Sequence, residues 1–354
     1  MSESFNPSRL VLARKRQGWT KAQLAVEAHL STRILFAYER LEKEPTPETV
    51  AIIAEKLCFP VEFFYGPDLD EPSLESASFR SLKKLTARHR DQALASGALA
   101  LTLSDWIDAK FHLPEPKIPI YDESMNPEIA AEGVRAEWGI GERPIKNMIH
   151  MLEAHGARVF SLREECRDLD AFSLWRIDAP YVFLNTFKSA EHMRMDGAHE
   201  LGHLVLHRRA APGRDVEREA KAFASAFLMP RGSVLAKAPR RGNLPSLIEA
   251  KHEWGVSVAA LAYRMHALDL LSDWQYRSLF VEMGRVGYLT NEPRGRQAES
   301  SAVLNKVMRS LRDDGVSLTA VARDLRIYPD ELNKLVFGLV LTEVPASQNL
   351  SSVA

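Results

Sequence analysis

The chain has few cysteines, almost no net charge and no long apolar run. Its 354 residues include two cysteines, Cys58 and Cys166, and its formal net charge at pH 7 is −1. The two thiols form no metal-type pair, so we expect both to be buried and free in a reducing compartment. The start, MSESFNPSRL, lacks the pattern of a signal peptide, and no stretch is long enough to span a bilayer. We therefore expect a cytoplasmic protein, in which any nucleic-acid contact comes from a local patch.

The length predicts two or three domains, and the sequence pattern divides the chain into four segments. Residues 1–66 form a string of short amphipathic helices. Residues 67–119 form a helical connector that ends in a stiff linker with three prolines. Residues 120–290 mix helices with short strands, which indicates an α+β domain. Residues 291–354 are helical with a disordered tail, and the run SLTAVARDLRI within them could be a helix-turn-helix. The predicted fold is thus multidomain, with an all-α first domain, an α+β domain and a helical C-terminal region.

The first segment carries the capping signals of two short helices joined by a tight turn. Thr20 and Gln23 form a capping box at the start of one helix. Ser31 caps the next helix, and Thr46 caps a third helix that begins at Pro47. This arrangement is the helix-turn-helix pattern.

The helix after Ser31 would be the recognition helix of a DNA-binding domain. We expect Thr32, Arg33 and Leu35 to face the major groove, and Lys21 and Gln23 to position the DNA backbone. The alternative is a protein-interaction or dimerisation module. It is favoured by apolar side chains on this helix and by nearby acidic residues, which are Ile34, Leu35, Phe36, Glu27, Glu39, Glu42, Glu44 and Glu48.

The third segment alternates helices and strands. A helix begins at Pro127 behind an Asn126 cap, and a second is expected from Pro144 to a stop at Gly156. Strands are expected in ARVFSL, AFSLWRI and YVFLN, followed by two helices built on AHELGHLVLH and DVEREAKAFASAFLMP.

The string HELGH, residues 199–203, carries the strongest chemical signal. Its two histidines lie one turn apart on one helix face, so both can reach one zinc ion at about 2.1 Å. Glu200 projects to where a zinc-bound water would sit. Zinc lowers the pKa of that water to about 7, and Glu200 can take the water's proton as a general base. The alternative is a solvated helix with two satisfied histidines. The surrounding leucines and valine argue for a buried helix, where ionisable groups need partners.

A catalytic zinc needs a third protein ligand. His207 continues the histidine series, but in a straight helix it lies about 12 Å along the axis from His199. We therefore expect His207 to support a ligand or the helix. Glu219 shares an apolar face of the next helix with Phe223 and other residues. A carboxylate on such a face is stabilised by a cationic partner, which a zinc ion would supply. Glu217 is the rival, and either could instead be a solvated carboxylate in the first turn.

Two of these segments resemble the ImmA/IrrE-type metallopeptidases. RMDGAHELGHLVLH matches the family's A-H-E-x-G-H helix, and EREAKAFASAFLMP matches its E-A-N-x-F-A…L-M-P helix. The resemblance implies one zinc ion, for which Mn2+ would also fit, held by His199, His203 and Glu219. Lys221 departs from the family pattern, because Asn usually stands there. The strand APYVFLNT resembles an edge strand that could hold a peptide substrate by strand addition, with Asn185 at its end.

An oxyanion in the transition state needs an electrophilic partner. Tyr263 and His266, in SVAALAYRMHALDL, are the two candidates for this role. Tyr263 could equally be a core residue.

The first domain is similar to XRE-type repressor domains, which also occur fused to the same peptidase family. Together, the motifs and the resemblance predict a cytoplasmic zinc endopeptidase that acts in gene regulation or stress response. The implied partners are operator DNA and a protein substrate, for which the resemblance implies a transcriptional repressor, and a homodimer is compatible with the pattern. One alternative is a DNA-binding regulator whose metal domain senses or stabilises without turnover. Another is an antitoxin-like module that binds a protein through its first domain.

Overall fold

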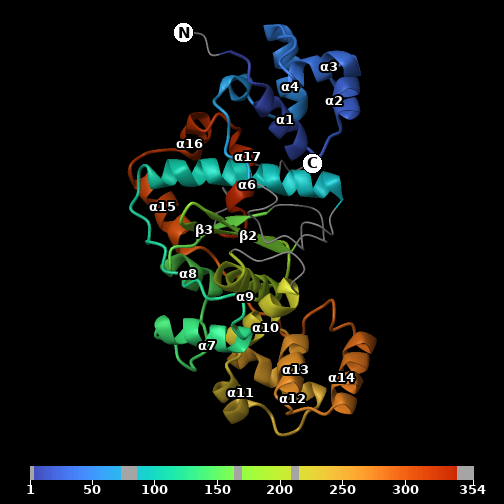
Figure 1. Cartoon of the computed structure of the whole chain (residues 1–354), viewed down its shortest axis with the longest axis vertical. Helices are drawn as coiled ribbons and strands as arrows, with labels where there is room; N and C mark the ends of the chain where they lie inside the picture. The colour runs from blue at the N-terminus through green and yellow to red at the C-terminus, as the bar shows by residue number, and fades with distance from the viewer. Residues whose placement is uncertain (1–3, 73–85, 163–169, 209–214, 341–354) are drawn as a thin grey trace, which may run out of the picture.

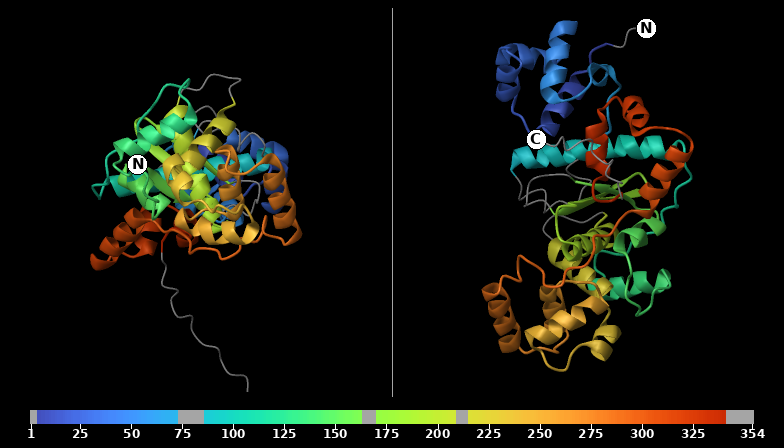
Figure 2. Two further views of the ribbon diagram at one scale, coloured as in Figure 1. Left: turned by 90° about the horizontal axis from the view of Figure 1, so that it is seen from below. Right: turned by 180° about the vertical axis from the view of Figure 1, so that it is seen from behind.

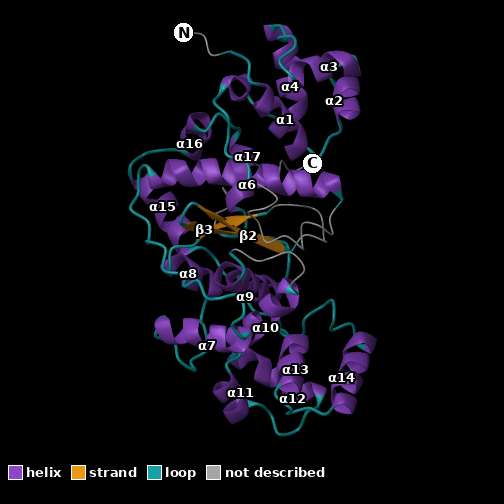
Figure 3. Ribbon diagram, viewed as in Figure 1, coloured by secondary structure: helices purple, strands orange, loops and turns teal. Residues whose placement is uncertain are grey.

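The structure is a computed structural model that describes residues 4–72, 86–162, 170–208 and 215–340. Figure 1 shows an elongated molecule built in layers. The helix-turn-helix domain lies at one end, helix α6 crosses below it, and a small sheet follows. Helices α9 and α10 lie on the other side of the sheet, and α11–α14 form the opposite end. The architecture is that of a multidomain α+β protein, and helices make up most of it (Figure 3).

The first domain is the predicted helix-turn-helix. Its elements are α1 (Pro7–Arg16), α2 (Lys21–Glu27), α3 (Thr32–Glu39), α4 (Pro47–Leu57) and the 3-10 helix η1 (Val61–Tyr65). The capping box of Thr20 and Gln23 is present, the Ser31 side chain accepts from the Ile34 amide, and Thr46 caps α4. Capping thus sets where each of these helices begins.

Helix α6 (Ala87–Asp108) falls in the segment predicted as a connector, but it belongs to the core. Gly97 lets Pro72 approach this helix, since a Cβ at position 97 would lie 2.8 Å from the Pro72 side chain, and the Phe172 ring of the sheet lies at ordinary contact distance, 3.5 Å. The Tyr181 hydroxyl donates to Ser104 at 3.3 Å across the same contact. The proline-rich stretch that follows has no helix or strand, as expected, yet it is bonded to the next domain. The Lys117 amide donates to the His155 carbonyl and the Tyr121 amide to the Val205 carbonyl, both at 2.9 Å.

The sheet has three strands, β1 (Arg158–Ser161), β2 (Ala171–Arg176) and β3 (Ala179–Leu184), as the sequence predicts. Their order is β1-β3-β2, with β1 parallel and β2 antiparallel to β3. Val182 of β3 therefore lies between Val159 of β1 and Ser173 of β2. The prediction that β3 is an edge strand is wrong, because β3 is the central strand of the described sheet and β2 lies at its edge.

Four helices lie on the side of the sheet away from α6. They are α7 (Pro127–Glu137), α8 (Met148–Ala154), α9 (Ala190–Leu206) and α10 (Val216–Leu228). Of these, α8 and α9 pack on the strands, and α7 and α10 pack beneath α9. The Asn126 cap of α7 is confirmed, but α8 begins at Met148 behind an Asn147 cap and not at Pro144. Gly156 follows α8 at φ +85°, and a Cβ there would meet the Glu115 backbone at 2.4 Å, so this position requires glycine.

The helices at the far end continue from α10. They are α11 (Arg231–Lys237), α12 (Leu244–Ala250), η2 (Lys251–Glu253), α13 (Val258–Ala267) and α14 (Asp273–Arg285). Two buried arginines tie the end of α10 to its neighbours. Arg135 of α7 donates to the Phe227 carbonyl, and Arg264 of α13 donates to the Met229 carbonyl. These bonds satisfy carbonyls that the helix end leaves without an internal partner.

The C-terminal region consists of α15 (Ala302–Asp313), α16 (Leu318–Asp324) and α17 (Pro329–Val336), and two reciprocal caps join α15 to α8. Glu153 at the end of α8 accepts from the Ala302 and Val303 amides at the start of α15. Glu299, just before α15, accepts from the Met148 and Ile149 amides at the start of α8. Each segment therefore supplies the carboxylate that caps the other's helix. The predicted disordered tail, residues 341–354, lies outside the described residues.

Helix α17 also links the first domain to the sheet. The guanidinium of Arg16 in α1 contacts the Glu331 carboxylate at 2.5 Å, and both side chains are buried. At the other end of α17, the Phe337 ring stacks on Phe187, which precedes α9, at 5.2 Å between ring centroids. Seen from behind, the C-terminal helices lie beside α6, between the two ends of the molecule (Figure 2).

Two further expectations have different outcomes. Cys58 is exposed, at the left-handed residue that ends α4, so the prediction that it is buried is wrong. Cys166 lies outside the described residues. Among the described helices, none has the length and apolar character needed to cross a membrane.

Candidate functional site

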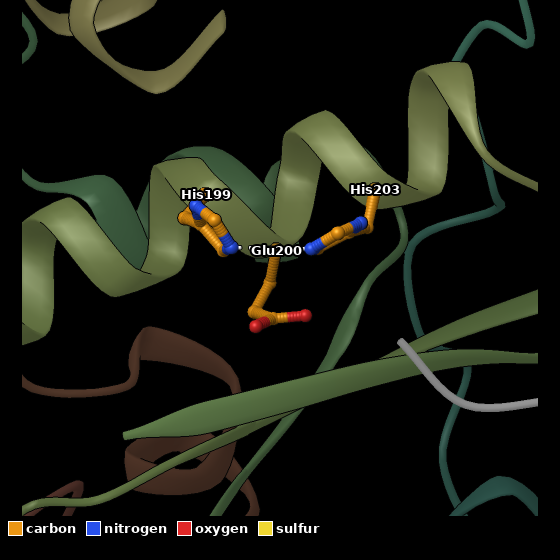
Figure 4. A group of neighbouring side chains, drawn as sticks. All are labelled: His199, Glu200 and His203. Carbon is orange, nitrogen blue, oxygen red and sulfur yellow. Dashed lines mark hydrogen bonds between the residues drawn. The ribbon is translucent and has the colours of Figure 1, made fainter. Parts of the chain in front are cut away.

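Helix α9 brings the two histidines of HELGH to one point. The Nε2 atoms of His199 and His203 lie 3.1 Å apart, and Figure 4 shows the two rings turned toward each other with Glu200 extending between them. Two nitrogens that each bind one tetrahedral zinc ion at 2.0–2.1 Å would be about 3.4 Å apart. The pair is therefore spaced to share one ion.

The third candidate ligand at this histidine pair is the carboxylate of Glu217. One carboxylate oxygen of Glu217 lies 3.5 Å from His199 Nε2, and the other lies 3.6 Å from His203 Nε2. Glu219 lies at His207 instead, with its Oε2 2.9 Å from His207 Nε2. The geometry thus favours the rival residue, Glu217, over the residue that the sequence and the resemblance preferred as third ligand.

The donor set fits a metal ion such as zinc. Glu217 Oε1 is buried and has no hydrogen-bond partner among the described residues. It faces imidazole nitrogens, which in their neutral form offer lone pairs. A metal ion shared with the two nitrogens would give this buried anionic oxygen a positive partner, and two histidines with one carboxylate are a zinc donor set of catalytic sites.

The packing of α9 against α10 explains why Glu217 reaches this point. Gly202, between the two histidines, lies against α10, where a Cβ would come within 3.2 Å of Ala220 and 3.1 Å of Phe223. Ala220 is one turn beyond Glu217, so the close approach at Gly202 turns the Glu217 side of the helix toward the histidines.

Glu200 is held by a residue that the sequence analysis did not single out. The Ser173 hydroxyl, in the middle of β2, donates to Glu200 Oε2 at 2.7 Å, and both residues are buried. A serine among the apolar residues of AFSLW was the available signal. The indole of Trp175 in the same strand donates to the Leu204 carbonyl at 3.1 Å, which fixes α9 on the strand.

The two histidines have opposite electrostatic surroundings. Burial lowers the pKa of His199, but its contact with Glu217 and the charges of Glu200, Glu217 and Asp196 outweigh this effect and raise the pKa. Burial, His199 and His207 together hold the pKa of His203 well below its usual value. His203 is therefore neutral at pH 7, which is the form that binds a metal. Burial also raises the pKa of Asp196, one turn before His199, to about 6.

The candidate oxyanion groups are engaged elsewhere. His266 Nε2 lies 2.8 Å from Asp273 Oδ1, and its ring stacks on Tyr276. The Lys221 ammonium lies over the Tyr263 ring, 4.6 Å from its centroid. The contacts of the described residues bring neither group to the histidine pair. Asn185 is buried at the end of the central strand, where its backbone N–H donates to the Asp170 carbonyl at 2.9 Å.

The predicted DNA-facing residues divide into three groups. Thr32 and Arg33 are exposed at the start of α3, as expected. Leu35 is fully buried in the domain core, so the prediction that it faces DNA is wrong. Lys21 contacts Glu39 at 2.8 Å, and Gln23 accepts from the Thr20 amide in the capping box. Of the five predicted residues, Thr32 and Arg33 are thus the best placed for DNA.

Two models of known families match parts of the chain. Residues 152–266 match the family model of the IrrE N-terminal-like domain, a metallopeptidase family, and residues 10–63 match a helix-turn-helix model. The first match contains the sheet, α9 and α10, with every candidate ligand. No curated protein matches the chain. The resemblance inferred from the two motifs and from the first domain is confirmed.

Proposed function

The chain combines an IrrE N-terminal-like peptidase domain with an N-terminal helix-turn-helix domain, and from this premise we propose that it is a cytoplasmic zinc-dependent endopeptidase. Its substrate is a protein, and the fusion to a DNA-binding domain favours a transcriptional repressor at the operator that the chain itself binds. The observation that carries the proposal is the convergence of His199, His203 and Glu217. Their facing atoms lie 3.1–3.6 Å apart, and the buried Oε1 atom of Glu217 accepts no hydrogen bond from the part of the chain that the structure describes.

In this proposal His199, His203 and Glu217 hold the ion. When bound, zinc supplies a Lewis acid that lowers the pKa of water to about 7 and polarises a carbonyl group. Glu200 takes the proton of the attacking water and passes it to the nitrogen of the departing product. The Ser173 hydroxyl orients the Glu200 carboxylate for both transfers.

The substrate strand would pair with β2. This strand forms an edge of the described sheet, and its central residue contacts Glu200. An extended peptide added along this edge would have its main chain fixed by backbone hydrogen bonds close to the proposed base. This assigns to β2 the role that the sequence analysis gave to the strand ending at Asn185.

A regulator that binds metal without turnover is the competing function. A purely structural site would not require a buried glutamate beside the ligands, held by a dedicated hydroxyl. The Ser173–Glu200 contact therefore favours the enzyme.

The test compares new protein amino-termini in cells that carry the wild type or Glu200→Gln. We expect a cut in one DNA-binding protein that is absent with the variant. The control is zinc content, which Glu200→Gln should retain because Glu200 is not a ligand. Identical sets of amino-termini under several stresses, with the wild type loaded with zinc, would favour the regulator.

A further inference from the structure

Three side chains form a continuous path from α10 to the candidate metal position. Glu219 Oε2 lies 2.9 Å from His207 Nε2, and His207 Nδ1 lies 3.1 Å from His203 Nδ1. The opposite edge of His203 carries the Nε2 atom that faces His199. The side chains of His203 and His207 are 5% and 4% exposed, so water cannot easily replace either partner.

The chemistry of these groups determines where each proton lies. A carboxylate only accepts, so His207 must carry its proton on Nε2 to bond Glu219. The Nδ1 atom of a neutral His207 is then an acceptor, and His203 must donate to it from its own Nδ1. This leaves the lone pair of His203 on Nε2, the atom that faces the candidate metal position.

We propose that His207 and Glu219 are positioning residues that hold His203 in its metal-binding tautomer and ring orientation. The inference rests on the proposed zinc site and extends it beyond the three ligands and the base. It gives two glutamates of one helix turn different roles. Glu217 faces the ion directly, whereas Glu219 acts through His207 and His203.

Local structure explains how the path is assembled. His207 is the residue at which α9 ends, and its amide donates to the His203 carbonyl at 2.9 Å. Glu219 lies in the first turn of α10, close to where Gly202 lets the two helices approach. The contact that brings Glu217 to the histidines therefore also brings Glu219 to His207.

The first measurement is the tautomeric state of the metal-free protein, with 15N-labelled histidine and long-range 15N–1H correlation spectra. We expect His203 to carry its proton on Nδ1 and His207 on Nε2. A His203 that carries its proton on Nε2 would overturn the proposal. This readout is independent of catalysis and of zinc.

The second measurement is zinc affinity in the full chain, by competition with a chromophoric chelator. Partners that orient metal ligands are typically worth about 10–100-fold in affinity, so we expect losses of this size for His207→Phe and for Glu219→Leu. His207→Asn should retain most of the affinity, because the Asn Oδ1 atom can accept from His203 where Nδ1 does. Asp215→Asn is the matched control, since it removes a charge from the same end of α10 and keeps a capping oxygen.

The double variant separates an indirect role of Glu219 from direct zinc binding. In the His207→Asn background, Glu219→Leu should cost little, because no imidazole remains for Glu219 to orient. An equal loss in both backgrounds would show that Glu219 binds zinc itself and would overturn the proposal. Unfolding curves identify any variant that fails to fold, and the His207→Asn background then supplies the comparison.

The same titrations distinguish failure of this inference from failure of the proposed function. A wild type that binds no zinc contradicts the proposed enzyme. A wild type that binds zinc and loses it with Glu217→Leu, but not with His207→Phe or Glu219→Leu, contradicts only the positioning role.

Discussion

Two units of two short helices joined by a turn lie in this chain, the helix-turn-helix of the first domain and the pair α16–α17 of the C-terminal region. Helices α2 and α16 each have seven residues, and α3 and α17 each have eight. In both units the second N-cap lies eleven residues after the first, at positions 20 and 31 and at positions 317 and 328. Both turns contain a left-handed residue at the same place, His29 at φ 54° and Arg326 at φ 57°.

The interior of the two units is also equivalent. Leu24, Ala25 and Leu35 are buried in the first unit, and Val321, Ala322 and Leu332 occupy the same positions, also buried, in the second. The same apolar spacing therefore underlies the fold of both units. The suggestion that SLTAVARDLRI begins a helix-turn-helix agrees with this geometry.

The residues at the second and third positions of the second helix differ between the two units, and the contacts of that helix differ with them. Arg33 and the half-buried Ile34 of α3 correspond to Asp330 and the buried Glu331 of α17. Glu331 binds Arg16, so α17 packs against the chain itself, whereas α3 presents a cation to solvent. The two units thus share a local fold, while the residues at these positions decide whether the second helix faces solvent or contacts the rest of the chain.

The largest expected effect comes from the contact that distinguishes α17. Glu331→Leu removes the carboxylate that contacts the buried Arg16 guanidinium, and breaking a buried pair in this way costs about 3–5 kcal/mol of unfolding free energy. Ile34→Leu, at the equivalent position of the first unit, should change stability little. Urea unfolding of the full chain measures both. A loss below about 0.5 kcal/mol for Glu331→Leu would mean that the pair behaves as a surface contact.

The pH dependence of the free energy of unfolding provides a second test of the Arg16–Glu331 pair. Burial raises the pKa of Glu331, but the charges of Arg16 and Lys334 outweigh it and lower the pKa below its ordinary value of 4.5. A lowered pKa in the folded state means that the stabilisation is present above pH 4.5 and is lost as the pH falls below it. The wild type should therefore lose stability in acid relative to the Arg16→Met/Glu331→Leu double variant. Parallel pH profiles would contradict this assignment.

The next effect concerns DNA binding. Arg33→Ala should weaken binding to the operator by about 1–3 kcal/mol, since it removes an exposed cation at the start of the reading helix. Asp330→Ala, at the same position of the second unit, should leave the affinity unchanged. Titration of both variants at one salt concentration gives the answer. Equal losses would mean that both units contact DNA.

The smallest effect concerns the caps. Ser31 caps α3, whereas Tyr328 at the start of α17 makes no side-chain cap. Ser31→Ala should lower the free energy of unfolding by about 1 kcal/mol, because α3 loses its cap. Tyr328→Ser should raise it by less than this amount, because α17 gains a cap. Thermal unfolding followed by circular dichroism measures both changes. A Tyr328→Ser variant less stable than wild type would show that the exposed ring matters more than the missing cap.

Local signals in the sequence predicted much of the fold. Thr20, Ser31 and Asn126 cap helices as expected, because capping depends on a few neighbouring residues. The three strands were also predicted, but not their order, because the alternation pattern does not say which strand is central. The expectation that Leu35 faces DNA is wrong because helical spacing places Leu35 on the same face as the buried Tyr38.

In the candidate site, sequence predicted the residues of one helix better than contacts between helices. The HELGH spacing alone brings His199 and His203 to one point. The choice between Glu217 and Glu219 depends on how α10 is rotated against α9, which the contact at Gly202 decides. Ser173 comes from a strand distant in sequence, so only the folded chain shows its contact with Glu200.

The reciprocal caps of Glu153 and Glu299 limit how far the chain can be shortened without loss of contacts. The family match ends at residue 266, yet the acceptor for the first amides of α8 comes from residue 299. A shortened chain that ended at the match would leave Glu153 without the Ser301, Ala302 and Val303 donors that it bonds in the full chain. It would also leave the buried Arg194 without its Glu299 partner. A shortened chain that is to keep these contacts around the candidate metal site must therefore extend beyond residue 266, at least to residue 303.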